Sequence, residues 1–293
     1  MSAADVRAWL MQKSAPLTVR YGGPLQIAGQ ELPAPERLRI PTRHGTVRCE
    51  LYRPPAAEHP PLYVHLHGGA FIMRHPRMDD FFARFLVAET RIAVLSVDYD
   101  VAPQVAYPVA HEQAHDVAAH LAAHGEELGV DGTRLGVGGF SAGGNLAAAA
   151  CLQARDLDSF APRFQLLGVP SLDVAEGYAD KQPVGSPMLG QGILDLVRST
   201  YFRDAGRRAE GYASPLRAAS LAGLPPTMLV TAERDLLRRE GDLYAERLRR
   251  AGVTVQHRLV PGRDHYFLDR ANARTEMGLM AGALRRRLVD VRV

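Results

Sequence analysis

Several residue types that mark common classes of protein are scarce in this sequence. Of its 293 residues only two are cysteines, Cys49 and Cys151, and their wide separation predicts neither a disulfide framework nor a zinc cluster. Lysine occurs only at Lys13 and Lys181, and the formal net charge is +3 at pH 7, so no basic surface for a nucleic acid is indicated. We therefore expect no nucleic-acid partner and no bound metal.

Long hydrophobic runs are also missing. No apolar stretch reaches the length of a membrane-spanning helix, and residues 1–13 lack the basic and then apolar arrangement of a signal peptide. A cytoplasmic protein without a membrane partner is therefore expected, as a monomer or a homodimer. The residues that are present, 46% hydrophobic and 23% charged, suit one large α/β domain with or without a small lid.

Apolar strand-like runs alternate with helix-like segments along most of the chain. This alternation predicts a parallel sheet with helices on both faces. Strands are expected at residues 37–40, 47–52, 62–66, 92–97, 135–137, 164–169, 227–230 and 253–260, the first two as a hairpin. Helices are expected at residues 2–12, 79–89, 109–128, 146–154, 193–202, 236–251 and 268–288.

Two segments depart from this alternation. Residues 1–35 contain a short amphipathic helix, with Val6, Trp9 and Leu10 on one face, followed by a stretch rich in proline and glycine. Residues 171–222 are rich in glycine, proline and polar side chains. We expect residues 1–35 to form an N-terminal cap or arm, and residues 171–222 to be inserted above the sheet of a main domain that spans residues 36–293.

The most informative stretch runs from Gly139 to Gly143, with the sequence Gly-Phe-Ser-Ala-Gly. It lies between an expected strand and an alanine-rich helix, and it fits the nucleophile-elbow pattern G-x-S-x-G. A serine on such a sharp turn has a strained backbone, so the residues two before and two after it must be very small. Its hydroxyl also lies at a helix N-terminus, where N–H groups favour developing negative charge. Ser141 is therefore a candidate nucleophile.

A serine nucleophile of this type needs an acid and a histidine that follow it in that order. Two histidines follow Ser141. His257 alternates with strand residues and is expected on a sheet face, whereas His265 lies in a loop after a strand, where catalytic groups gather in such sheets. Glu233 and Asp235 compete for the acid, and Asp235 could instead only cap the helix that follows it.

Negative charge in the transition state needs backbone N–H donors near the nucleophile. One is expected from Ala142, and the others from the loop His67-Gly-Gly-Ala70, which matches the HGGG type. A competing motif is His111-Glu-Gln-Ala-His115, a literal H-E-x-x-H of zinc peptidases. Its extended form requires a third histidine where Leu121 stands, although Glu126 or Glu127 could be proposed as the third ligand. A surface helix that carries several histidines is the favoured interpretation.

Taken in order, these motifs resemble those of the hormone-sensitive-lipase-like α/β-hydrolases, the bacterial family IV esterases. The resemblance spans about residues 36–290. Residues 67–71 are similar to HGGGF, residues 99–108 to the YRLAPE…FP stretch, residues 139–145 to GDSAGGN, residues 232–241 to AEYDPLRDEG, and residues 262–267 to the terminal G…HGF.

The resemblance implies an α/β-hydrolase fold: a mostly parallel eight-stranded sheet, flanking helices, and a helical cap formed by the two irregular segments. It implies a triad of Ser141 as nucleophile, His265 as base and Asp235, not Glu233, as acid. It also implies that the H-E-x-x-H segment lies on a helix flanking the sheet, away from the active site.

The oxyanion hole that the resemblance implies consists of the N–H groups of Gly69, Ala70 and Ala142. The sequence departs from the family pattern at four positions: Leu236 replaces a proline, Tyr266 replaces a glycine, and the other two are Ala70 and Phe140. Ala70 replaces a glycine, so its backbone must adopt a conformation that tolerates a Cβ atom. Phe140 replaces an acidic residue, which removes a hydrogen-bonding anchor for the elbow.

These observations predict a carboxylic ester hydrolase that forms an acyl-enzyme and needs no cofactor or metal. Its partner is expected to be a small ester with a short to medium acyl chain, a range that the resemblance implies. Bulk from Phe71, Tyr266 and Phe267 near the nucleophile favours a short acyl site. Apolar residues of the two cap segments, Val6, Trp9 and Leu10 among them, are expected to close a finite pocket.

Two alternatives stay open. One is a catalytically weak ligand-binding protein on a hydrolase fold, although such scaffolds usually lose the base or the nucleophile. The other is a zinc peptidase that uses residues 111–115. Cleavage of an ester that is insensitive to chelators would favour the serine mechanism over this second alternative.

Overall fold

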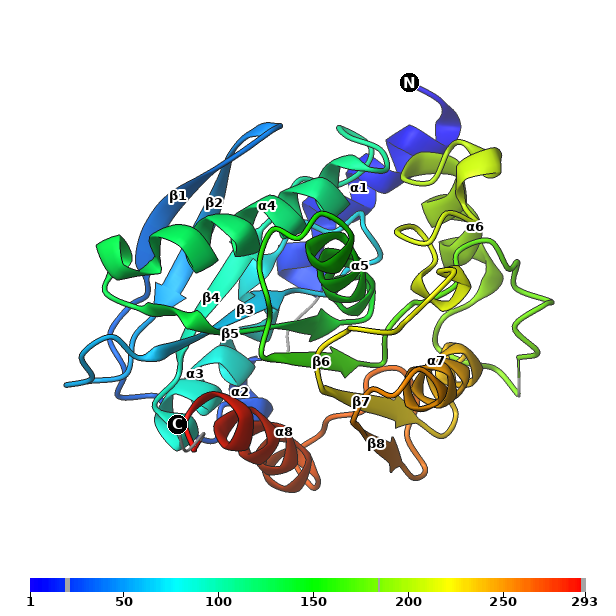
Figure 1. The fold of residues 1–293 in the computed structure, drawn as a ribbon. Helices are drawn as coiled ribbons and strands as arrows, with labels where there is room; N and C mark the ends of the chain where they lie inside the picture. The colour runs from blue at the N-terminus through cyan, green and yellow to red at the C-terminus, as the bar shows by residue number, and fades with distance from the viewer. Residues whose placement is uncertain (19–21, 184, 291–293) are drawn as a thin grey trace.

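An eight-stranded sheet in the order β1-β2-β4-β3-β5-β6-β7-β8 forms the centre of the computed structural model (Figure 1). The structure describes residues 1–18, 22–183 and 185–290. Residues 19–21 of the expected N-terminal arm, residue 184 of the expected insertion and residues 291–293 lie outside the described residues.

The strands follow the apolar runs of the sequence closely. β1 and β2 form the expected antiparallel hairpin, β2 is antiparallel to β4, and the other neighbouring strands are parallel. The prediction of a mostly parallel eight-stranded sheet is therefore confirmed. The strands are β1 (Glu36–Thr42), β2 (Gly45–Tyr52), β3 (Pro61–Leu66), β4 (Ala93–Asp98), β5 (Asp131–Phe140), β6 (Phe164–Gly168), β7 (Thr227–Ala232) and β8 (Val255–Val260).

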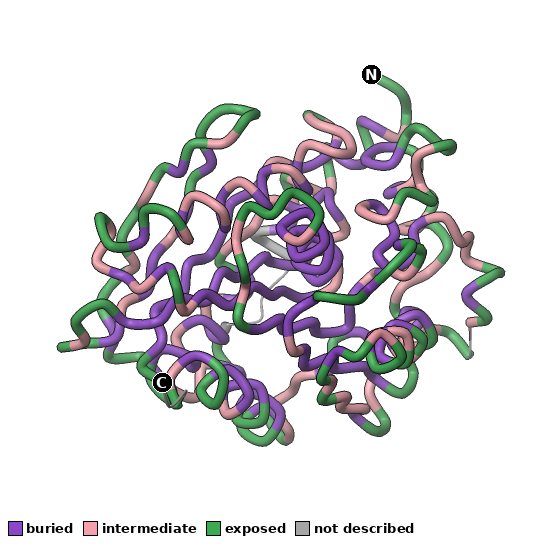
Figure 2. The backbone as a smooth tube through the Cα atoms, in the orientation of Figure 1, coloured by how far each residue is buried: buried purple, intermediate pink, exposed green. Residues whose placement is uncertain are grey.

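Helices cover both faces of this sheet. On one face α4 (Val109–His124), α5 (Ala142–Asp156) and α7 (Arg238–Arg250) share a hydrophobic cluster, and on the other α3 (Asp80–Thr90) packs against α8 (Ala273–Leu288). Every residue of β3, β4 and β7 is consequently buried, as the purple centre of Figure 2 shows. Short 3₁₀ turns add η1 (Pro76–Asp79), η2 (Gly125–Leu128), η3 (Ala205–Arg207) and η4 (Pro215–Arg217).

The two segments that are expected to form a cap contact each other beside the sheet. α1 (Ala3–Thr18) packs against α6 (Gln191–Thr200), which belongs to the 171–222 segment (Figure 1). The chain after α2 (Gly22–Leu25) instead runs along α3, where Arg84 donates to Leu32 O at 2.9 Å. No helix in the described part of the chain is long and apolar enough to cross a membrane.

The face that α1 presents to the protein differs from the expected one. The exposed fractions of Val6, Trp9 and Leu10 are 44%, 42% and 56%, so the expectation that these residues close the pocket is wrong. The helix buries Ala8 and Ala15 instead. Alanines let the helix approach the core closely, and the bulky apolar face is left toward solvent.

Candidate active site

Ser141 lies at the turn between β5 and α5, in a backbone conformation that residues other than glycine rarely adopt. Its φ and ψ are 55° and −116°. A Cβ atom on Gly139 would collide with the carbonyl oxygen of Leu66, and one on Gly143 would collide with the same oxygen. The close approach of β3 to this turn therefore requires both glycines, as the motif predicts.

The side chains of Ser141, His265 and Asp235 form a chain of two hydrogen bonds. Ser141 Oγ lies 2.8 Å from His265 Nε2, and His265 Nδ1 lies 3.0 Å from Asp235 Oδ2. His265 comes from the loop between β8 and α8, and Asp235 from the loop between β7 and α7. With Asp235 ionised, Nδ1–H donates to the carboxylate, so Nε2 accepts the hydroxyl proton of the serine.

Burial and charge act in opposite directions on the imidazole of His265. Burial disfavours its charged form, but the Asp235 carboxylate and its hydrogen bond outweigh this effect. The pKa of His265 is consequently raised above its ordinary value of 6.5. A raised pKa makes the imidazole a better acceptor for the proton that a serine hydroxyl releases.

The competing candidates Glu233 and His257 lie apart from this chain of hydrogen bonds. Glu233 is exposed and accepts the N–H of Gly262 at 2.6 Å, while His257 contacts side chains of β7 and α7. Asp235 itself has two partners, because its Oδ1 accepts the N–H of Leu237 at 3.1 Å while Oδ2 faces the imidazole. α7 begins at Arg238 with Leu237 at its N-cap and no side-chain cap, so the interpretation of Asp235 as a cap of this helix is wrong. The hydrogen bond to Leu237 belongs to the turn before α7.

The loop after β3 passes beside Ser141 along a left-handed path. The φ angles are 119° at Gly69, 55° at Ala70 and 56° at Phe71. Ala70 therefore keeps a conformation that glycine adopts freely, at a cost of about 1 kcal/mol for its Cβ atom. Ala142 is the first residue of α5, where helix N–H groups have no intrahelical partner.

His67 and Tyr99 hold the start of this loop in place. The Tyr99 hydroxyl donates to His67 O at 2.7 Å, and the two rings stack with centroids 4.4 Å apart. Burial lowers the pKa of His67 to about 4, so the imidazole is neutral and donates through Nδ1 to Gly68 O at 2.6 Å. His67 therefore supports the loop from a fully buried position.

A cavity of about 250 Å³, here called the larger pocket, opens beside Ser141 and His265. Two of the three predicted substrate contacts, Tyr266 and Phe267, line it. The rest of its wall is mostly apolar and includes, from α1, η1, the elbow and the 171–222 segment, Met11, Met78, Phe140, Met188, Leu189 and Ile193.

A second cavity of about 60 Å³, here called the smaller lobe, also reaches Ser141. Phe71, the third predicted substrate contact, lines this lobe, and its ring stacks on that of Tyr201 with centroids 5.0 Å apart. Ala142 also lines the lobe, whereas His265 lines only the larger pocket. The smaller lobe has several charged side chains on its wall: Asp173, Glu176, Lys181 and Arg198.

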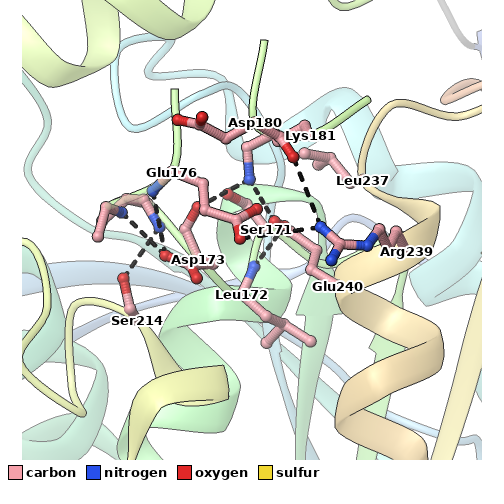
Figure 3. A network of polar contacts seen from close by, with 12 residues as sticks. Ser171, Leu172, Asp173, Glu176, Asp180, Lys181, Ser214, Leu237, Arg239 and Glu240 are labelled. Carbon is pink, nitrogen blue, oxygen red and sulfur yellow. Dashed lines mark hydrogen bonds and ion pairs between the residues drawn. The ribbon is translucent and has the colours of Figure 1, made fainter. Parts of the chain in front are cut away.

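A buried ion pair between Lys181 and Glu240 joins the 171–222 segment to α7 (Figure 3). Each of the two side chains is 4% exposed. Lys181 Nζ also donates to Asp173 O at 2.7 Å, and the N–H of Leu172 donates to Glu240 Oε1 at 2.6 Å. Burial raises the pKa of Glu240 to about 7, although Lys181 lowers it. The ion pair thus ties the segment to the helix that follows the predicted acid.

Some side chains at the site escape sequence reasoning. Phe140 does more than remove an anchor from the elbow: its ring packs 4.9 Å from Phe82 and fills the space beside Gly168. Asp79, on the wall of the larger pocket, lies 2.9 Å from the buried His65. The position of Phe140 directly before the nucleophile could have identified it as a residue of the site. No sequence motif identifies the pair of Asp79 and His65.

The H-E-x-x-H segment lies on α4, which flanks the sheet as the resemblance implies. His111 lies 2.8 Å from Asn145 Oδ1 and 3.0 Å from the Tyr201 hydroxyl, while His115 lies 2.8 Å from Ser159 Oγ. Within residues 1–18, 22–183 and 185–290, no three His, Cys, Asp or Glu side chains are grouped to hold a metal ion. His111 contacts Asn145 of the elbow motif directly, so this segment braces α5.

Comparison with known proteins places this geometry in a family. The family model described as alpha/beta hydrolase fold matches residues 63–269. An arylesterase of Saccharolobus solfataricus is 33% identical over 252 residues, which are 83% of this chain and 82% of the relative. An ethyl acetate hydrolase of Pseudomonas putida is 33% identical over 238 residues, which are 79% of this chain and 74% of the relative.

The solved structures agree with these relatives. An esterase of Pyrobaculum calidifontis superimposes with a TM-score of 0.86 at 30% identity, over 97% of this chain and 93% of the other. The chain therefore belongs to the α/β-hydrolase fold family and, within it, to the hormone-sensitive-lipase-like esterases.

Proposed function

We propose that this chain hydrolyses carboxylic esters at Ser141, with His265 as the base and Asp235 as the acid that orients it. Ser141 Oγ attacks the acyl carbon while His265 Nε2 takes its proton, and Asp235 holds the imidazole by Nδ1. His265 then gives the proton to the leaving alcohol, and water hydrolyses the acyl-enzyme. The continuous chain from Asp235 Oδ2 through His265 to Ser141 Oγ is the observation that carries this proposal.

Ester hydrolysis as the reaction class rests on the family and on its members. The relatives named above carry the names arylesterase and ethyl acetate hydrolase. A serine, a base and an acid are all present here, which favours an enzyme over a ligand-binding protein on an inactive scaffold. The chain is a carboxylic ester hydrolase.

We assign the oxyanion hole to the N–H groups of Gly69, Ala70 and Ala142. Two of these residues line the larger pocket next to Ser141, and the third begins α5. Donors that are fixed before the reaction stabilise the developing oxyanion without reorganisation, which is the largest contribution in many acyl-transfer enzymes.

The two cavities divide the ester between them. His265 must protonate the leaving oxygen, so the alcohol extends into the larger pocket, which His265 lines. The acyl group then extends into the smaller lobe beside Ala142, whose volume of about 60 Å³ favours short chains. We therefore propose acyl groups from acetyl to about hexanoyl, with residues 1–35 and 171–222 as the cap and residues 36–293 as the catalytic domain.

The surroundings in which the enzyme works are part of the same proposal. A cytoplasmic location and a monomeric or homodimeric state stay predictions from the sequence. The partner that we propose is a small-molecule ester, and the mechanism derived above uses only groups of the chain itself and water.

The test is an acyl-chain-length series of aryl esters with the wild-type protein and with Ser141→Ala. We expect kcat/KM to be greatest between acetyl and hexanoyl, and Ser141→Ala to lower kcat by about 10⁴–10⁶-fold. An organophosphonate probe should label Ser141 alone. Full activity in Ser141→Ala would refute the mechanism, and a maximum at long acyl chains would refute the assignment of the smaller lobe.

A further inference from the structure

The smaller lobe has a mostly apolar wall that also carries charged residues. It reaches Ser141, and Asp173, Glu176, Lys181 and Arg198 are among the residues that line it. An acyl group that enters the lobe therefore meets charged residues as well as apolar ones. Burial of charged groups against alkyl carbon is unfavourable, so the lobe is better suited to an acyl chain with a polar end.

Most of the charges on this wall already have a partner of opposite sign. Lys181 pairs with Glu240, and both side chains are buried (Figure 3). Asp173 lies 2.8 Å from Arg217, and Glu176 lies 3.9 Å from Arg239. Each of these pairs is formally neutral. The charge that the lobe presents to a ligand is therefore decided by the fourth side chain, Arg198.

Arg198, on α6, has no carboxylate partner among the residues that the structure describes. Its guanidinium makes one hydrogen bond to protein, from Nη2 to Ala175 O at 3.4 Å. Asp180 lies on the same loop as Ala175, and its carboxylate accepts the N–H of Gly177 and no hydrogen bond from Arg198. Burial, and after it the neighbouring Arg198 charge, lower the pKa of Arg208, while Asp204 raises it.

Lys181 is the other cationic residue on this wall. An ammonium group has three N–H bonds, and Lys181 uses two of them, for Glu240 and for Asp173 O. Arg198 is therefore the cation of the smaller lobe that has no carboxylate partner among the described residues. A guanidinium on the wall of a small cavity is an arrangement that proteins use to bind a carboxylate.

We propose that the smaller lobe binds the terminal carboxylate of the acyl group, so that the preferred substrates are half-esters of short dicarboxylic acids, with Arg198 as the specificity-determining residue. This inference rests on the proposed function and on the assignment of the acyl group to the smaller lobe. The acyl C–O bond of the half-ester breaks, water supplies hydroxide to the acyl carbon and a proton to the alcohol, and the products are a dicarboxylate and the alcohol.

Two esters of equal shape test the proposal. Ethyl hydrogen succinate carries a carboxylate where ethyl 4-methylpentanoate carries an isopropyl group, so the pair differs in charge at one end. Ethyl esters are used because a neighbouring carboxylate attacks activated aryl esters without an enzyme. Release of acid is followed by pH-stat titration at pH 8, where the half-ester is an anion.

The variants are Arg198→Gln, which removes the charge, and Arg198→Lys, which keeps it. We expect Arg198→Gln to lower kcat/KM for ethyl hydrogen succinate about tenfold or more, mainly through KM, as expected for one lost charge-assisted hydrogen bond. The 4-methylpentanoate should change less than about twofold, and Arg198→Lys should recover part of the loss. Arg203→Gln is the matched control, because Arg203 pairs with Asp5 and lines neither cavity.

Three results would overturn the proposal. In the first, wild-type protein hydrolyses the 4-methylpentanoate but not the succinate. In the second, Arg198→Gln lowers the rates for both esters equally, which indicates a structural role. In the third, Arg203→Gln lowers kcat/KM for ethyl hydrogen succinate as much as Arg198→Gln does. If wild-type protein hydrolyses neither ester, nor any aryl ester of the chain-length series, the proposed function itself is wrong and this inference falls with it.

Discussion

Replacement of Lys181 by methionine measures what the buried ion pair contributes to the fold. Methionine keeps most of the aliphatic stem and removes the ammonium. Since Lys181 and Glu240 are each 4% exposed, the variant leaves a carboxyl buried without its counter-ion. Loss of one member of such a pair costs about 3–5 kcal/mol of unfolding free energy. For a domain of this size, that loss lowers Tm by roughly 6 °C or more.

The loss should depend on pH, because protonation relieves the buried charge. Burial raises the pKa of Glu240 from its ordinary 4.5 to about 7 even with Lys181 present, and without Lys181 the pKa rises further. A carboxyl with a raised pKa in the folded state stabilises the fold most below pH 4.5 and loses that effect as pH rises through the folded value. Lys181→Met should therefore be more destabilised at pH 9 than at pH 6.

Urea-induced unfolding at these two pH values, followed by circular dichroism, gives the free energies. Lys13→Met is the control, since Lys13 is exposed and its loss should change stability by no more than about 0.5 kcal/mol. The double variant Lys181→Met with Glu240→Gln should recover part of the loss, because it removes the unpaired charge. Equal stability of Lys181→Met and Lys13→Met, at both pH values, would refute the reasoning.

Two further predictions concern the acid and the elbow. Asp235→Asn should lower kcat by about 10⁴-fold, because the variant holds His265 in the wrong tautomer. It should also move the acid limb of the profile of kcat/KM against pH to lower pH, because the Asp235 charge raises the pKa of His265. Glu233→Gln should cost far less, and the reverse order of severity would mean that the acid is misassigned. Gly143→Ala should destabilise the protein by about 3 kcal/mol or more in thermal unfolding, because its Cβ atom meets Leu66 O. Gly278→Ala, in open space on α8, should be neutral or stabilise by up to about 1 kcal/mol, and similar losses in both alanine variants would contradict the steric argument.

The strands and the proposed triad could be predicted because both leave local patterns in the sequence. Buried parallel strands are continuous apolar runs, so the run at residues 62–66 corresponds to β3 with little ambiguity. Ser141 lies between two obligatory glycines, and His265 lies in a loop directly after a strand. Because the acid and the histidine must follow the serine in that order, only a few sets of residues could form the triad.

Other features depend on contacts between distant segments and could not be predicted. Lys181 and Glu240 are 59 residues apart, and no sequence motif predicts that they pair. The packing face of α1 was mispredicted because periodicity identifies an apolar face but not whether the core accepts bulky or small side chains. The smaller lobe likewise results from the meeting of α5, α6 and the loop after β6.

The larger pocket is lined by residues from the N-terminal and the C-terminal part of the chain, among them Met11 on α1 and Tyr266 and Leu268 after β8. During synthesis Met11 leaves the ribosome early, Ser141 follows, and the residues after β8 come much later. A nascent chain therefore carries the serine while it still lacks His265 and one wall of the pocket. On the mechanism proposed above, ester cleavage reaches its full rate only after the residues that follow β8 have been made and folded onto the sheet.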